Sequence, residues 1–142
     1  MRYFDSGVLL KLYLPEPNSE QAVRLIEQLG SAAPLTELHQ LEMRSAIIQK
    51  HCRNEITETD RDGAMSDFES DITSGIFTLP LTMWRNVFTT AQSLAMTHAN
   101  ILCRSLDTIH VALALEIGAT EFCTFDQKQA SLAKAAGFIV IP

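Results

Sequence analysis

Three aspartates of this sequence stand where a short strand is expected to end or a helix to begin. Asp5 follows the β-type segment of residues 1–4, Asp107 lies in the first turn of an expected helix, and Asp126 follows the apolar segment of residues 120–125. In open α/β sheets, the carboxyl ends of the strands and the amino ends of the helices meet at one edge, where ligands bind. We therefore expect these three carboxylates to lie at one edge of a parallel sheet.

Each of these aspartates also has a purely structural interpretation at the start of a helix. Asp5 suits the cap of the helix that follows it, and Asp107, placed behind a Ser105 cap, would be stabilised by the helix dipole. Asp126 would cap the next helix, with Gln129 at the capping-box position. Taken singly, the structural and functional interpretations are equally consistent with the sequence, so a functional site needs support from other residues.

A fourth acid, Glu42, lies inside a helix expected from Thr36 to about Cys52. At roughly 100° per residue, its side chain falls about 40° from Leu38, on the flank of the apolar side of that helix. That apolar side is expected to consist of Leu38, Leu41, Ser45, Ile48 and Cys52. A glutamate beside a buried surface needs a partner, which is either a metal ion or a basic side chain such as Arg44 or Lys50.

Four carboxylates gathered at one edge would repel one another unless they took up protons or bound cations. Ligand sets that contain only oxygen select hard ions such as Mg²⁺ or Mn²⁺. Such an ion also changes the meaning of the formal net charge of −6, which alone argues against a nucleic-acid ligand. A bound divalent cation reverses the local sign and lets an acidic pocket accept a phosphate.

The rest of the chain is typical of one soluble domain that spans residues 1–142. Alternating helical and strand segments predict an α/β fold with a parallel sheet of about five strands, covered by helices on both faces. The seven acids of residues 55–71 are interpreted as the solvated face of a helix. No segment has membrane-spanning length, and the three widely spaced cysteines suggest neither a disulfide framework nor a zinc site. These features predict a cytoplasmic protein.

Five short segments, in this order and spacing, carry a resemblance to a known family. They are residues 3–7 (Tyr-Phe-Asp-Ser-Gly), 41–46 (Leu-Glu-Met-Arg-Ser-Ala), 105–114 (Ser-Leu-Asp-Thr-Ile-His-Val-Ala-Leu-Ala), 124–126 (Thr-Phe-Asp) and 133–137 (Ala-Lys-Ala-Ala-Gly). Over nearly its whole length the chain resembles the PIN-domain ribonucleases, particularly bacterial toxins of the VapC type. The resemblance implies a three-layer PIN-like fold and a metal-dependent endoribonuclease. It also implies that Asp5, Glu42, Asp107 and Asp126 are both metal ligands, for Mg²⁺ or Mn²⁺, and catalytic residues.

The same resemblance implies supporting residues and partners. Ser6 and Thr124 match hydroxyl residues that support the acids, although such hydroxyls also form local caps and hydrogen bonds. The implied partners are an RNA substrate, an antitoxin protein encoded beside the toxin, and a second copy of the chain in a homodimer. Because the sequence Gln-Lys-Gln follows Asp126, no further acid is close by to add to the cluster, so the sequence leaves open whether a second metal ion is tightly held.

Two further residues near Asp107 have competing interpretations. Arg104 stands three residues before Asp107, where it is a candidate contact for a substrate phosphate or a simple charge balance for the acid. His110 belongs to the same motif, but its place on an apolar helix face favours a packed core histidine over a functional one.

The hypothesis drawn from the sequence is metal-assisted hydrolysis of a phosphodiester bond, with Asp5 and Asp107 as the main ligands of an ion that acidifies a bound water. A receiver-like signalling module is an alternative, but the expected third strand, residues 75–79, is followed by no aspartate. A second alternative is a catalytically inactive PIN-like scaffold that binds RNA or protein, and the presence of all four acids argues against it. A haloacid-dehalogenase-type phosphatase would need an aspartate where Gly7 stands.

Overall fold

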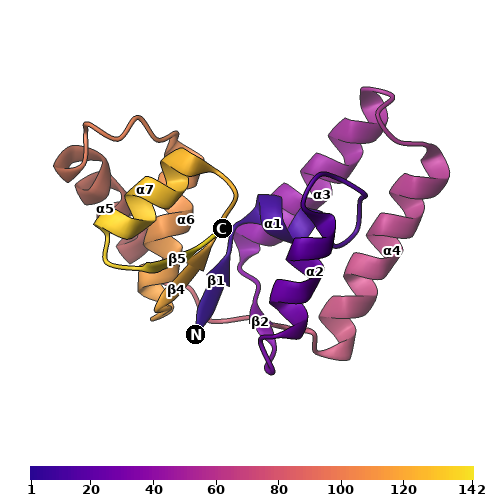
Figure 1. The fold of residues 1–142 in the computed structure, drawn as a ribbon, viewed down its shortest axis with the longest axis horizontal. Helices are drawn as coiled ribbons and strands as arrows, with labels where there is room; N and C mark the ends of the chain where they lie inside the picture. Colours follow the sequence, from indigo (N-terminus) through magenta and orange to yellow (C-terminus); the bar gives the residue numbers. More distant parts are fainter. The chain divides into compact units, whose positions relative to one another are not determined.

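The computed structural model describes all residues, Met1–Pro142, and divides into two compact units. Unit 1 comprises Met1–Asp5 and Pro80–Pro142, and unit 2 comprises Ser6–Leu79. Seven helices and five strands follow one another along the chain, and every strand pair is parallel (Figure 1). The predicted α/β class with parallel strands is therefore confirmed. The prediction of a single domain over residues 1–142 stays a prediction.

Unit 1 contains a three-stranded parallel sheet with the strand order β1-β4-β5. Its elements are β1 (Arg2–Phe4), α5 (Trp84–Thr97), α6 (Ser105–Glu116), β4 (Glu121–Cys123), α7 (Gln127–Ala135) and β5 (Ile139–Ile141). Gly118, with a φ of 72°, follows the last turn of α6, in the left-handed conformation that favours glycine at a helix end.

Aromatic packing on β1 and β4 forms the centre of unit 1. Tyr3 and Phe122 are fully buried, and their rings stack with centroids 5.3 Å apart. The Tyr3 hydroxyl also forms a hydrogen bond of 2.7 Å with Nδ1 of His110, which is buried in α6. This partner satisfies a polar group inside the core. The interpretation of His110 as a packed core histidine is therefore confirmed.

Unit 2 consists mainly of helices around a two-stranded parallel sheet. Its elements are α1 (Ser6–Leu10), α2 (Ser19–Glu27), β2 (Ala33–Pro34), α3 (Glu37–Cys52), α4 (Glu58–Ser74) and β3 (Phe77–Thr78). Thr57 and Asp60 form the capping box that starts α4. Helices α3 and α4 pack side by side, where Arg44 binds Glu69 at 2.6 Å and lies over the Phe68 ring.

The predicted apolar side of α3 is wrong in part. Leu38 is buried as expected, but the other fully buried apolar residues of the helix are Met43 and Ile47. Leu41 is 64% exposed, and Ile48 is also exposed. The helix carries apolar residues on two faces, and only the face that packs against α1 and α4 is buried. Periodicity alone does not distinguish two such faces.

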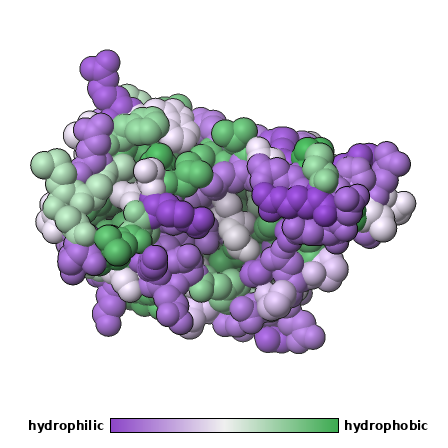
Figure 2. Space-filling view, turned by 90° about the horizontal axis from the view of Figure 1, so that it is seen from above, coloured by the Kyte–Doolittle hydropathy of each residue, from purple (hydrophilic) through white to green (hydrophobic).

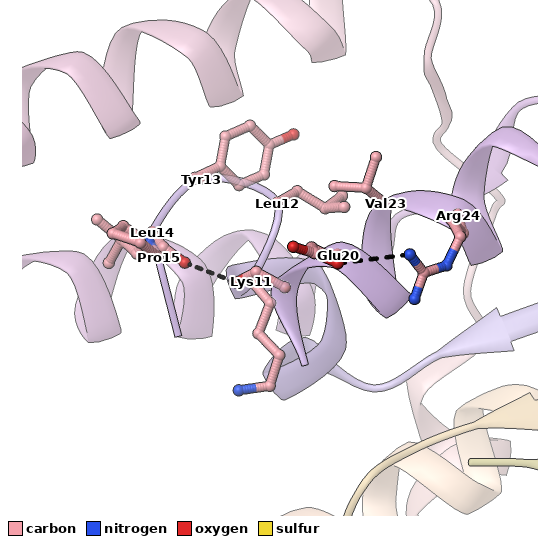
Figure 3. Close-up of a pocket in the computed structure, with 9 residues that line it drawn as sticks. Lys11, Leu12, Tyr13, Leu14, Pro15, Glu20, Val23 and Arg24 are labelled. Carbon is pink, nitrogen blue, oxygen red and sulfur yellow. Dashed lines mark hydrogen bonds and ion pairs between the residues drawn. The ribbon is translucent and has the colours of Figure 1, made fainter. Parts of the chain in front are cut away.

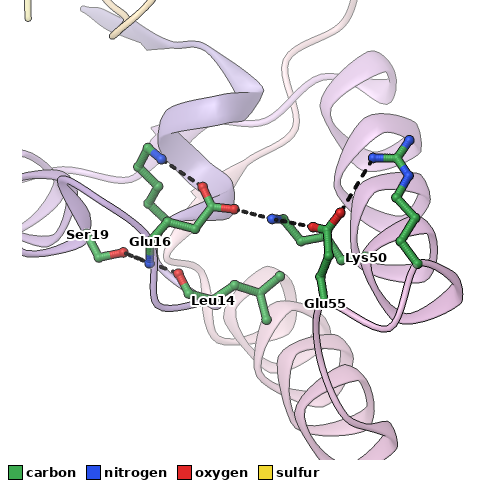
Figure 4. Close-up of polar contacts among 7 residues, drawn as sticks. Leu14, Glu16, Ser19, Lys50 and Glu55 are labelled. Atoms are coloured by element: carbon green, nitrogen blue, oxygen red, sulfur yellow. Dashed lines mark hydrogen bonds and ion pairs between the residues drawn. The ribbon is translucent and has the colours of Figure 1, made fainter.

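A network of lysines and glutamates ties the connection between α1 and α2 to the end of α3 (Figure 4). Glu16 accepts from Lys11 at 2.7 Å and from Lys50 at 2.5 Å, and Lys50 also binds Glu55 at 3.3 Å. Burial raises the pKa of Glu16, but the hydrogen bonds from the two lysines outweigh burial, so the pKa is lowered from its usual value. The ionised glutamate therefore stabilises the folded state.

We expect Glu16 to make the stability of the protein depend on acid pH. Because its pKa is lower in the folded than in the unfolded state, its contribution should be complete above the usual value of 4.5 and lost as pH falls further. Glu16→Gln should lower the free energy of unfolding at neutral pH by about 1–3 kcal/mol. It should also weaken the pH dependence below 4.5. Urea unfolding at a series of pH values measures both effects.

Glu20→Gln is the matched control, because Glu20 is 92% exposed and pairs only with Arg24 in the next helical turn. Its free energy of unfolding should stay within about 0.5 kcal/mol of the unmodified protein. Equal losses in the two variants would contradict the role given to the Glu16 network.

Candidate active site

The pairing of β1 with β4 places Asp5 and Thr124 side by side at the carboxyl end of the sheet. Phe4 pairs with Cys123 in register, and the Asp5 amide donates to the Cys123 carbonyl at 2.9 Å. The Thr124 hydroxyl donates to Oδ2 of Asp5 at 3.2 Å and accepts from the Asp126 amide at 3.0 Å. A single buried hydroxyl thus links two of the candidate acids.

Asp126 is the N-cap of α7, as one of its two interpretations predicted. Its Oδ1 accepts from the amides of Lys128 and Gln129, at 2.8 and 2.9 Å. Its Oδ2 accepts no hydrogen bond within the protein, so one oxygen of this carboxylate is available to a ligand. Structural capping and ligand binding are therefore compatible at Asp126.

The capping box predicted for Gln129 is not formed. In that motif the Gln129 side chain would accept from the Asp126 amide, but Thr124 accepts from that amide instead. Gln129 is fully buried, and neither its side-chain nitrogen nor its side-chain oxygen has a hydrogen-bond partner. Such unsatisfied groups cost free energy on burial, which makes this a region where stability has been lost next to a candidate acid.

Asp107 lies in the first turn of α6 and is paired with Arg104. The Arg104 guanidinium donates from Nε to Oδ2 at 2.9 Å and from Nη2 to Oδ1 at 3.3 Å. The Asp107 side chain is 14% exposed, whereas that of Arg104 is 81% exposed. The cap predicted at Ser105 is wrong, because Ser105 is the first helical residue and Arg104 is the N-cap. The negative charge of Asp107 lies in the first turn of the helix, where the helix dipole stabilises an anion.

Asp107 and Asp126 act electrostatically on the same neighbours. Burial raises the pKa of the Cys103 thiol, and the charges of Asp107 and Asp126 raise it further. The hydrogen bond to Asp107 raises the pKa of Arg104, with a smaller contribution from Asp126. Two acids that are 19 positions apart in the sequence therefore face a common region of unit 1.

The two cysteines of unit 1, Cys103 and Cys123, have thiols whose pKa is raised. Burial raises the pKa of the Cys123 thiol to about 12, and the nearby charges of Asp5 and Glu121 also raise it. Cys103 is shifted in the same direction. Both shifts favour the protonated thiol in the metal-free protein.

In unit 2, Glu42 is held by Ser6. The Ser6 hydroxyl, at the start of α1, donates to Oε2 of Glu42 on α3 at 2.6 Å. The basic residues considered as structural partners of Glu42 form other ion pairs, Arg44 with Glu69 and Lys50 with Glu16 and Glu55. Ser6 follows Asp5 directly in the sequence, so the hydroxyl that holds one acid is bonded through the backbone to another.

The chemistry of these residues fits a hard divalent cation. Carboxylate and hydroxyl oxygens are the ligands that Mg²⁺ and Mn²⁺ prefer, and Asp126 has an oxygen that no other group occupies. No three histidine, cysteine, aspartate or glutamate side chains within either unit gather closely enough to hold a metal ion. A centre that contains all four acids stays a prediction.

Two cavities of the protein are lined by residues other than these acids. The cavity drawn in Figure 3 has a volume of about 550 Å³, belongs to unit 2 and is lined by residues between Lys11 and Arg24, with the Glu20–Arg24 ion pair at its wall. A cavity of about 250 Å³ in unit 1 is lined in part by Ser105 and Thr108, which stand before and after Asp107 in the sequence of α6. Neither cavity is lined by a candidate acid, so it is hydrogen bonding that identifies the site.

Comparisons with known proteins identify the fold and the family. The family model described as the PIN domain matches residues 2–135. The crystal structure of FitAcB from Neisseria gonorrhoeae is similar in fold, with a TM-score of 0.71 and 18% sequence identity, and the match covers 100% of this chain and 97% of that chain. No curated protein sequence is a significant match.

We expect the Thr124 hydroxyl to stabilise the edge that carries Asp5 and Asp126. Thr124→Val keeps the shape of the side chain but leaves the Asp126 amide without its acceptor. The free energy of unfolding should fall by about 1–3 kcal/mol, and hydrogen exchange at the Asp126 amide should become faster. Thr124→Ser keeps the hydroxyl and should lose less. A serine variant as unstable as the valine variant would show that the lost methyl group, and not the hydroxyl, matters.

Proposed function

Because the chain belongs to the PIN domain family, whose members are typically nucleases, we propose that it is a metal-dependent endoribonuclease and the toxin of a toxin–antitoxin pair. The observation that carries the proposal is the Thr124 hydroxyl, which links Asp5 to Asp126 at the edge where open α/β folds bind ligands. The resemblance of the sequence to VapC-type toxins adds the RNA substrate and the antitoxin.

The proposed centre consists of Asp5, Glu42, Asp107 and Asp126, which together hold Mg²⁺ or Mn²⁺. A divalent ion bound there supplies positive charge for the scissile phosphate and acidifies a water for attack on phosphorus. With four carboxylates and one or two such ions, the site gains the charge balance that an acidic protein needs in order to bind an RNA backbone.

Hydrogen bonds from neutral groups orient three of the four acids in this scheme, and Asp107 is paired with Arg104. Thr124 donates to one oxygen of Asp5 and Ser6 donates to one oxygen of Glu42. Two backbone amides hold one oxygen of Asp126. Donors of this kind are neutral, so they orient a carboxylate without adding positive charge to it. Support of this kind for metal ligands changes metal affinity by about 10–100-fold.

The alternatives are less consistent with the fold. A receiver-like module requires a phosphoacceptor aspartate after the third strand, but β3 is followed by Leu79 and Pro80. A catalytically inactive scaffold has no use for hydroxyls that hold Asp5 and Glu42. Metal binding distinguishes the scaffold from the nuclease, because only the nuclease should lose Mn²⁺ binding when Asp5 or Asp107 is replaced.

The partners follow from the same resemblance and from the surface. Unit 1 exposes several large apolar side chains, among them Leu81, Met96 and Leu102. Apolar and polar residues also alternate over the face seen in Figure 2. Exposed apolar side chains suit contacts with other proteins, and we propose an antitoxin and a second copy of this chain as those proteins. No helix of the chain is long and apolar enough to cross a membrane, and we propose that the protein acts in the cytoplasm.

We expect Asp5→Asn and Asp107→Asn to lower cleavage of single-stranded RNA by at least about 100-fold, because each removes a charged ligand while keeping the side-chain shape. Cleavage should require added Mg²⁺ or Mn²⁺ and stop with EDTA. Gel analysis of a labelled RNA measures both effects. Asp67→Asn is the control, since Asp67 is exposed on α4 and forms no hydrogen bond. Unchanged turnover in Asp5→Asn would contradict the proposed mechanism.

The toxin assignment has a separate test in cells. Induced expression of the chain should arrest bacterial growth, and the Asp5→Asn variant, expressed at the same level, should not. Co-expression of the neighbouring reading frame should restore growth if it encodes the antitoxin. Growth that continues during expression of a nuclease shown to be active in vitro would leave the enzyme assignment intact and exclude the toxin role.

A further inference from the structure

The ion pair between Arg104 and Asp107 occupies both oxygens of a candidate metal ligand. Nε of Arg104 donates to Oδ2 at 2.9 Å and Nη2 donates to Oδ1 at 3.3 Å. An ion that binds Asp107 needs at least one of these oxygens. Arg104 and a divalent cation therefore compete for the same carboxylate.

The exposure of the two partners shows which of them can move. The Asp107 side chain is 14% exposed and belongs to α6, whereas the Arg104 side chain is 81% exposed at the N-cap of that helix. An arginine so exposed makes few packing contacts that would hold it in one conformation, so it can leave the carboxylate while the helix stays in place. Exposed ion pairs of this kind change an equilibrium by only about two- to fivefold.

After leaving Asp107, the guanidinium is suited to a different anion. Its planar fork binds two oxygens of a phosphate as well as it binds a carboxylate. Its backbone is fixed at the start of α6, three positions before Asp107, so the freed side chain stays near the candidate metal site. The phosphate backbone of the substrate is the anion that arrives there.

We propose that Arg104 is an exchangeable counter-ion of Asp107, which it binds while no divalent cation is present and leaves for a phosphate of the RNA when the cation binds. This inference rests on the function proposed above and adds a residue that couples cation binding to substrate binding. Since coupling between two ligands is reciprocal, RNA that attracts Arg104 also relieves the competition for Asp107.

The first test is a calorimetric titration of Mn²⁺ into metal-free protein. Arg104→Gln removes the competitor and should tighten Mn²⁺ binding about two- to fivefold. Lys128→Gln removes the same charge next to Asp126, but its side chain forms no ion pair, so its effect should be smaller. If Mn²⁺ bound equally more tightly to both variants, the lost positive charge alone would explain the result and the proposal would be overturned. Unchanged Mn²⁺ affinity in Arg104→Gln would also overturn it.

The second test is the salt dependence of RNA cleavage at saturating Mn²⁺. Arg104→Gln should raise KM for a single-stranded RNA more than it lowers kcat. The slope of log KM against log salt concentration should fall by about 0.7, the value for one phosphate contact on a single strand. An unchanged slope would show that Arg104 balances the charge of Asp107 and does not contact RNA.

The titration also separates this inference from the proposed function. If the unmodified protein binds no Mn²⁺, or Asp107→Asn binds it equally well, the metal-dependent nuclease itself is excluded. If Asp107→Asn loses Mn²⁺ binding while Arg104→Gln binds like the unmodified protein, the nuclease stands and only the exchange of Arg104 is excluded. Circular dichroism confirms that each variant is folded, which the exposure of Arg104 and Lys128 favours.

Discussion

The parallel pairing of β1 with β4 is the interaction on which the candidate site depends. Residues 1–5 and the segment around Thr124 are separated by more than a hundred positions, and only the register Phe4 to Cys123 brings Asp5 and Thr124 together. The buried stack of Tyr3 on Phe122 fixes that register from the core side. A slip of one residue would turn every side chain to the other face of the sheet, and the contact between Asp5 and Thr124 would be lost.

Elements with a strong local signal could be predicted from the sequence. The positions of Asp107 in the first turn of α6 and of Asp126 at the N-cap of α7 are determined by neighbouring residues, and the structure has them where the pattern indicated. The α/β class also followed from the alternation of segments. The buried face of α3 could not be predicted in the same way, because both of its apolar faces satisfy the helical period and only tertiary packing selects one.

The residues of the candidate site could be predicted from the sequence more readily than the hydrogen bonds between them. Asp5, Asp107 and Asp126 were found from their positions at strand ends and helix starts, but nothing local indicated that Thr124 would bind the Asp126 amide and displace Gln129 from its capping role. Arg104 lies three positions before Asp107, and that spacing allowed either an ion pair with Asp107 or a phosphate contact. The ion pair forms with Arg104 in an extended backbone conformation at the N-cap. Such contacts arise from tertiary geometry, so a sequence pattern can propose them without selecting among them.

The chemistry of the partners, more than the number of acids, distinguishes a candidate metal site from a solvated surface in this protein. The helix α4 is the most acidic element, yet five of its six acids have structural partners. Glu69 pairs with Arg44, Glu58 and Asp62 pair with Arg61, and Asp71 accepts from the Tyr13 hydroxyl. Asp60 caps its own helix.

The acids at the edge of unit 1 have partners of another kind. The Asp126 carboxylate accepts from backbone amides, and the Thr124 hydroxyl donates to Asp5, so these neutral groups orient the two carboxylates. Asp107 is the exception, and its counter-ion is an exposed side chain able to leave. We propose that this edge, and not the acidic helix, is where a divalent ion binds, because carboxylates that repel one another attract either protons or cations.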